Sequence, residues 1–132
     1  MKDNTILTID QLSRITSALQ SRRKKLKKMF DPGCQKCRRE IRQKYQTTLS
    51  ALSELSKQTP RTLRYNGKDE TTAVLTVAQW HEVAASLEST YRDISREIKE
   101  NCPHCPNIKS AKNAEIVIRE LQAKIKKIID RQ

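Results

Sequence analysis

Apolar residues recur about every 3.5 positions along four segments of the chain, each roughly 20–25 residues long. This spacing gathers them on one side of a helix, so the pattern predicts four amphipathic helices. The four apolar stripes are Leu12, Ile15, Leu19 and Leu26 with Met29 or Phe30; Ile41, Tyr45, Leu49, Leu52 and Leu55; Trp80, Val83 or Ala84, Leu87, Tyr91, Ile94 and Ile98; and Ala114, Ile118, Leu121, Ile125 and Ile128.

The glycines and prolines lie between these stripes. They number only six and fall at three places: Pro32 with Gly33, Pro60 with Gly67, and Pro103 with Pro106. Because glycine and proline are the strongest breaks in regular structure, three connections are predicted. The middle connection is β-prone, since Arg61–Tyr65 and Thr72–Thr76 flank the turn sequence Asn66-Gly67. Together with Ile6–Thr8, these segments predict a very small sheet.

The chain also repeats itself at an offset of 68 residues. Identical residues recur at this offset: Leu7 and Leu75, Thr8 and Thr76, Gln11 and Gln79, Leu19 and Leu87, Cys34 and Cys102, and Cys37 and Cys105. In the returning helices the register drifts by a residue. The sequence therefore predicts a single domain over 1–132, in which pseudo-repeats 5–58 and 73–130 are joined by a β-prone linker at 59–72. The predicted fold class is all-α with a minor β element, a four-helix bundle of two helix–CxxC–helix hairpins.

Each pseudo-repeat begins with the same helix-start signal. Thr8-Ile-Asp-Gln11 and Thr76-Val-Ala-Gln79 both fit a capping box, in which threonine satisfies an amide of the first turn and glutamine reaches back. A hydrophobic staple is predicted beside each box, between Leu7 and Leu12 and between Leu75 and Trp80.

The composition limits the class of protein. A chain of 132 residues suits one domain, and no stretch approaches the ~20 apolar residues of a membrane span. Lys2 and Asp3 are followed by no apolar segment, so we expect no secretory signal and an intracellular location, cytoplasmic, nuclear or nucleoid. Aromatic residues make up only 4%, which argues against modules that stack nucleic-acid bases on exposed rings.

The four cysteines form two CxxC turns, Cys34-Gln-Lys-Cys37 and Cys102-Pro-His-Cys105. Two such turns supply the four thiolates of a tetrahedral zinc site. In an up-down bundle the first and third helices end on the same side, which would bring all four thiolates together. The sequence therefore predicts one structural Zn²⁺ per chain, bound by Cys34, Cys37, Cys102 and Cys105. A full set of four cysteine ligands leaves no open position for catalysis.

Other fates of the cysteines stay open at this point: disulfides within or between the pairs, an iron–sulfur cluster, or a dithiol oxidoreductase. Cys102-Pro-His-Cys105 resembles the active-site tetrapeptide of thiol-oxidising thioredoxin-fold enzymes. The alternation of strands and helices that this fold requires is absent from the sequence.

The positive charge is concentrated in one half of the chain. The net charge is +12, and residues 1–66 hold 16 Lys and Arg against 5 Asp and Glu, whereas residues 67–132 hold 11 against 10. The cations predicted to bind a partner are Arg22, Arg23, Lys24, Lys25, Lys27, Lys28, Lys36, Arg38, Arg39, Arg42 and Lys44. The equivalent stretch of the second repeat, residues 90–96, has mixed charge, so a bundle of this kind does not itself require a cationic helix. A solubility role is the alternative.

Cations without interleaved aromatic residues are suited to phosphate contacts that depend little on base sequence. The leading hypothesis is therefore a non-enzymatic, zinc-containing protein that binds DNA, RNA or a nucleoprotein complex. The alternatives are an adaptor that docks on an acidic protein surface and, third, a thiol-redox sensor. The sequence contains no phosphate-binding glycine loop, nucleophile elbow or paired carboxylates in a defined motif, and His81 has no catalytic partner in sequence. We therefore expect no small-molecule substrate and no membrane partner.

Overall fold

The computed structural model describes residues 2–29, 35–58, 70–100 and 106–131. In chain order, these residues form β1 (Lys2–Thr8), α1 (Ile9–Lys28), α2 (Gln35–Gln58), β2 (Glu70–Thr76), α3 (Val77–Glu100) and α4 (Pro106–Asp130). The predicted helical class with a small β element is confirmed for this part of the chain. The β-prone segment Arg61–Tyr65 lies outside the described residues. Among the helices that the structure describes, none combines the length and the apolar character needed to cross a membrane.

Both predicted capping boxes are present. Thr8 Oγ1 accepts a hydrogen bond from the Gln11 backbone N–H at 3.2 Å, and Gln11 Oε1 accepts one from the Thr8 N–H at 3.0 Å. Thr76 and Gln79 repeat the arrangement at 3.2 and 2.8 Å. The residues of the two predicted staples are all buried in one core cluster: Leu7, Leu12, Leu75 and Trp80. Local sequence therefore fixes where α1 and α3 begin.

The two strands form an antiparallel pair in which Thr5 lies opposite Ala73. A two-stranded sheet has two open edges, and here side chains cover part of each. The Gln58 amide donates to the Val74 carbonyl and accepts from the Val74 N–H, both at 2.7 Å. On the other edge, Lys124 Nζ donates to the Ile6 carbonyl at 2.9 Å.

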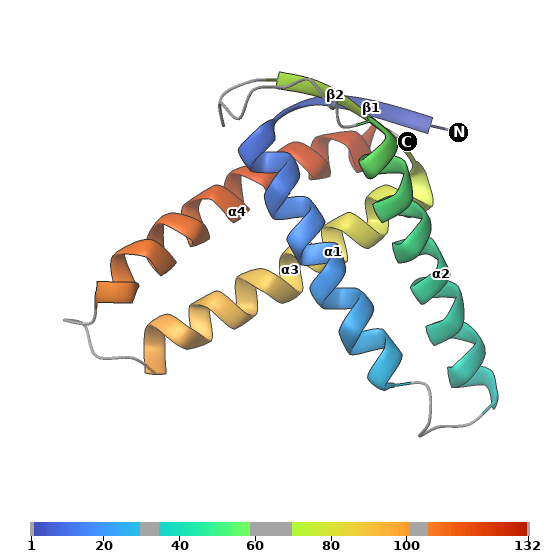
Figure 1. Cartoon of the computed structure of the whole chain (residues 1–132), viewed down its shortest axis with the longest axis horizontal. Helices are drawn as coiled ribbons and strands as arrows, with labels where there is room; N and C mark the ends of the chain where they lie inside the picture. The colour runs from blue at the N-terminus through green and yellow to red at the C-terminus, as the bar shows by residue number, and fades with distance from the viewer. Residues whose placement is uncertain (1, 30–34, 59–69, 101–105, 132) are drawn as a thin grey trace.

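The helices form two arms that spread from the sheet: α1 and α2 make the first arm, and α3 and α4 the second (Figure 1). Because β1 and β2 are antiparallel, the helices that follow them start at opposite ends of the sheet, and α1 crosses α3 (Figure 1). Small residues sit on these two helices at equivalent positions, with Ala18 only 2% exposed and Ser86 only 1% exposed. The core cluster fills the space between the sheet and the crossing.

This crossing differs from the predicted up-down bundle, in which both CxxC turns share one end. The outer ends of the two arms, away from the sheet, lie at different corners of the molecule (Figure 1). Near-parallel hairpins would place both turns at one end, whereas the strand pairing makes the helices diverge after they cross.

Buried positions recur along the chain at nearly the offset expected for the repeat. Ile15 and Val83 are fully buried at an offset of 68 residues, as are Leu19 and Leu87. In α2 and α4 the offset is 70, as Thr48 and Ile118, Ala51 and Leu121, and Leu55 and Ile125 show. The drift in the returning helices is therefore two residues rather than one.

Candidate nucleic-acid interface

The predicted partner-binding cations come from the last turns of α1 and the first turns of α2. These helices lie side by side in the first arm (Figure 1), so the turns are brought together at its outer end. On α1 they are Arg22, Arg23, Lys24, Lys25, Lys27 and Lys28; on α2 they are Lys36, Arg38, Arg39, Arg42 and Lys44. The side chain of Lys36 lies outside the described residues.

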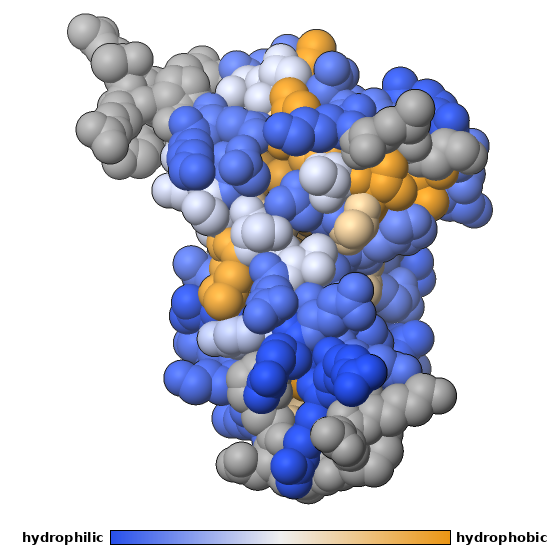
Figure 2. Space-filling view, turned by 90° about the vertical axis from the view of Figure 1, so that its right-hand side faces the viewer, coloured by the Kyte–Doolittle hydropathy of each residue, from blue (hydrophilic) through white to orange (hydrophobic). Residues whose placement is uncertain are grey.

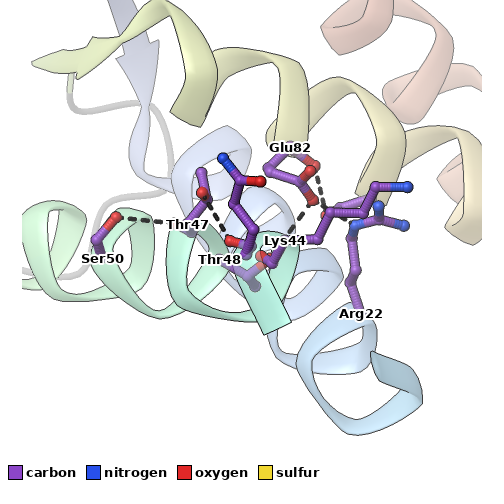
Figure 3. A network of polar contacts seen from close by, with 8 residues as sticks. Arg22, Lys44, Thr47, Thr48, Ser50 and Glu82 are labelled. Carbon is purple, nitrogen blue, oxygen red and sulfur yellow. Dashed lines mark hydrogen bonds and ion pairs between the residues drawn. The ribbon is translucent and has the colours of Figure 1, made fainter. Parts of the chain in front are cut away.

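Arg22 is engaged within the fold. Its Nε donates to Glu82 Oε2 at 2.6 Å, and the two side chains are only 19% and 13% exposed. Thr48 Oγ1 lies 3.5 Å from the same carboxylate oxygen and donates to the Lys44 carbonyl at 2.8 Å (Figure 3). Since Arg22 belongs to α1, Glu82 to α3 and Thr48 to α2, this network joins three helices. Such a shielded, charge-assisted contact is stronger than an exposed ion pair.

Lys25 also reaches α3. Its Nζ donates to Asp93 Oδ2 at 2.9 Å and to Ser89 Oγ at 2.8 Å. The Lys25 and Asp93 side chains are about half exposed, 49% and 48%, so solvent weakens their attraction. Sequence reasoning missed both acidic partners, Glu82 and Asp93. The offset of 68 residues between Lys25 and Asp93 was the one available signal for the second.

Several other predicted cations of the first arm face solvent. Six exposed residues make no ion pair or side-chain hydrogen bond with any described residue: Lys24, Lys27, Lys28, Arg39, Arg42 and Lys44. Arg23 is half-buried and likewise has no such contact within the described ranges. Glu40 is the only acidic residue in segments 20–28 and 35–46. In the view onto this side of the molecule, strongly hydrophilic residues gather toward the outer end (Figure 2).

The outer part of the second arm carries a different charge pattern. Its segments 90–100 and 106–116 mix cations with acids: Arg92, Arg96, Lys99, Lys109 and Lys112 with Asp93, Glu97, Glu100 and Glu115. The unequal distribution of charge between the two halves of the sequence therefore becomes a difference in charge between two arms of similar build. Like charges close together raise the free energy of the first arm, and a polyanion would lower it.

The predicted zinc site lies outside the described residues. This holds for Cys34, Cys102 and Cys105 and for the side chain of Cys37. Within the part of the chain that the structure describes, no group of three His, Cys, Asp or Glu residues is placed to hold a metal ion. The outer ends of the described helices lie at separate corners (Figure 1), whereas the expected convergence of four thiolates concerns residues outside the described ranges and stays a prediction. Zinc binding stays a prediction as well.

Trp80 and His81 were given no catalytic role by the sequence, and one is a core residue while the other is on the surface. Trp80 is fully buried, and its Nε1 donates to the Asp3 carbonyl at 3.0 Å. His81 is exposed on α3.

No protein-family model, no curated protein and no solved structure matches this chain.

Proposed function

We propose that this protein binds nucleic acid through the phosphate backbone, using the exposed cations of the first arm. The observation that carries the proposal is the set of six solvent-facing cations on two adjacent helices, with one acidic residue among them. Lysine and arginine side chains in such a set replace the counterions around phosphates. Because few aromatic residues are available for stacking, binding depends little on base sequence.

In this proposal two sets of cations in the arm have different roles. Arg22 and Lys25 hold α1 against α3 through Glu82 and Asp93, so they contribute mainly to the fold. The six exposed cations contribute mainly to binding. This division allows the exposed residues to be changed without loss of the core, which lies between the sheet and the helix crossing.

The cysteines have a structural role in the proposal. Zinc bound to thiolates would order the outer ends of the arms and would leave no open coordination position for a reaction. Cys34 and Cys37 lie next to Lys36, Arg38 and Arg39 in sequence, and these cations offset the negative charge of a zinc–thiolate centre. Some of the positive charge near the turn is thereby explained without nucleic acid.

The test compares two triple variants that remove the same charge from different arms. Lys24→Gln/Lys27→Gln/Lys28→Gln changes the first arm, and Lys99→Gln/Lys109→Gln/Lys112→Gln changes exposed residues of the second. Binding to a fluorescein-labelled 20-base-pair DNA duplex is measured by anisotropy from about 50 to 200 mM salt. We expect the first variant to lower the slope of log K against log salt by about 0.9 per lost phosphate contact, and the second to lower it much less.

Three results would contradict this proposal. One is the absence of duplex binding by the wild-type protein at about 50 mM salt. Another is tighter binding to poly-glutamate than to a duplex of equal total charge, which would indicate an acidic protein partner. Equal losses in the two triple variants would show that net charge, and not the first arm, governs binding.

A further inference from the structure

The helix crossing forms a polar cavity of about 500 Å³, and cationic side chains from both arms line it. The charged residues in its wall are Arg22 and Lys25 from α1, and Glu88, Arg92, Asp93 and Arg96 from α3. Four cations thus stand against two carboxylates. The hydroxyl of Ser89 also lies in the wall, and no aromatic side chain does.

Both carboxylates in this wall already have partners. Asp93 accepts from Lys25 at 2.9 Å. Glu88 Oε1 lies 3.3 Å from Arg92 Nε, and Glu88 Oε2 accepts a hydrogen bond from Gln122 Nε2 at 2.8 Å. Arg96 is exposed and makes no ion pair with any residue in the described ranges. Arg22 is paired with Glu82, which lies outside this wall, so Arg96 is the one cation of the wall without a carboxylate partner among the described residues.

The two arginines of α3 occupy positions that correspond to cations of the first arm. Arg92 and Arg96 follow Lys24 and Lys28 by 68 residues, and all four side chains are exposed. The same offset separates Lys25 from Asp93, which face each other at the crossing. It also separates the residues opposite each other at the centre of the sheet, Thr5 and Ala73.

The equal offset at these two facing pairs is the relationship that an approximate two-fold axis through them would produce. Rotation about such an axis exchanges β1 with β2 and α1 with α3, which matches both the antiparallel strand register and the helix crossing. Lys24 and Lys28 then lie on one side of the Lys25–Asp93 pair, and Arg92 and Arg96 lie at the equivalent place on the other.

We infer that the phosphate-binding surface continues across the helix crossing onto α3, where Arg92 and Arg96 contact the same nucleic-acid backbone as the first arm. The inference rests on the proposed function and extends it. Arginine suits this role because its planar guanidinium binds phosphate oxygens in a bidentate manner. The ligand is a continuous phosphodiester backbone, because the cations lie on both sides of the crossing and belong to both arms.

The test uses a double variant and a control of equal charge. Arg92→Gln/Arg96→Gln changes the cavity wall, and Lys99→Gln/Lys112→Gln removes two exposed cations of the same arm that do not line the cavity. Binding to the labelled 20-base-pair DNA duplex is measured at about 100 mM salt. We expect the cavity variant to bind about tenfold more weakly than the wild type, with the salt slope lowered by about 0.9 per lost contact, and the control to change much less.

Two further variants keep the result interpretable if the double variant is poorly folded. Arg96→Gln removes no ion pair of the described residues and is expected to show about half of the slope change. Arg92→Lys/Arg96→Lys preserves the charge and is expected to retain most of the binding. Thermal unfolding and far-UV circular dichroism of each variant establish that it is folded.

The inference and the proposed function fail in different ways. If the cavity variant and its control lose the same small amount of affinity, while the triple variant of the first arm loses much more, the surface ends at the first arm and the inference is wrong. The proposed function would then still stand. If the wild-type protein itself does not bind the duplex, the proposed function fails and the inference fails with it.

Discussion

Lys25 Nζ lies 2.9 Å from Asp93 Oδ2, and these two residues occupy corresponding positions in the two halves of the chain, 68 residues apart. If the two halves were identical, this contact would join two identical residues, either two lysines or two aspartates. The opposite charges therefore favour contact between unlike halves. Like charges in that place would oppose contact between two copies of the same half.

Lys25→Asp is expected to destabilise the protein, because it places two carboxylates together at the crossing. The loss is expected to be about 0.2–1 kcal/mol, as is usual for exposed pairs. The swapped variant Lys25→Asp/Asp93→Lys should recover most of the loss, since it restores a pair of opposite charges at the crossing. Urea unfolding at low salt measures both changes. A swapped variant no more stable than the sum of its two single changes would contradict the pairing.

Glu82→Gln is expected to cost more stability than the loss of the exposed pair. The change leaves the Arg22 guanidinium, 19% exposed, without its carboxylate. Removal of one partner from a shielded, hydrogen-bonded pair costs about 1–3 kcal/mol. The measurement is the free energy of unfolding from urea titration.

The matched control for this change is Arg14→Gln, which lies 68 residues before Glu82. Arg14 is half-buried and makes no ion pair within the described part of the chain. Its loss is expected to change stability by less than about 0.5 kcal/mol. Similar losses for the two variants would show that the Arg22–Glu82 contact contributes nothing specific.

The purified, reduced protein is expected to contain about one zinc ion per chain, bound by thiolates, as the cysteine content predicts. Mass spectrometry of metals, with and without chelator, measures this content. Cys34→Ser and Cys102→Ser should each lower it. A protein without zinc would contradict the metal prediction. A ratio of one ion per two chains, together with a dimer in solution, would show that the ion lies between chains.

Loss of the metal is expected to remove only part of the helical signal in circular dichroism. The buried cluster lies between the sheet and the crossing, and outside it the buried apolar residues of the helices are Leu26 and Ile108 among those described. If the predicted zinc is bound, the outer ends of the arms are therefore expected to depend on it more than the core does. Complete unfolding by chelator would contradict this division.

Much of the local structure follows from residues close together in sequence. The apolar spacing gave the helices, and the two Thr–Gln boxes gave the starts of α1 and α3, because a capping box is formed by residues only three positions apart. The strand Glu70–Thr76 was predicted in part by its β-prone composition. The excess of cations in the first half was visible by counting.

The roles of particular cations could not be predicted in this way. The sequence predicts that Arg22 and Lys25 bind a partner as their neighbours do. Which of the cations meets an acid depends on a helix 60 to 68 residues away in the chain. Arg92 and Arg96 were not predicted for a related reason. Acidic residues lie close to them in sequence, so the net charge of their segment is near zero.

The sequence by itself determined the helices, their caps, the β-prone segments and the charge that the first arm carries, since these depend on side chains within a few residues of one another. The tertiary structure alone decided that β1 pairs with β2 in an antiparallel register. That pairing starts α1 and α3 at opposite ends of the sheet and makes them cross (Figure 1). The crossing in turn selects which cations are neutralised and which face solvent, because attraction between charges depends on their distance in space and not on their separation along the chain.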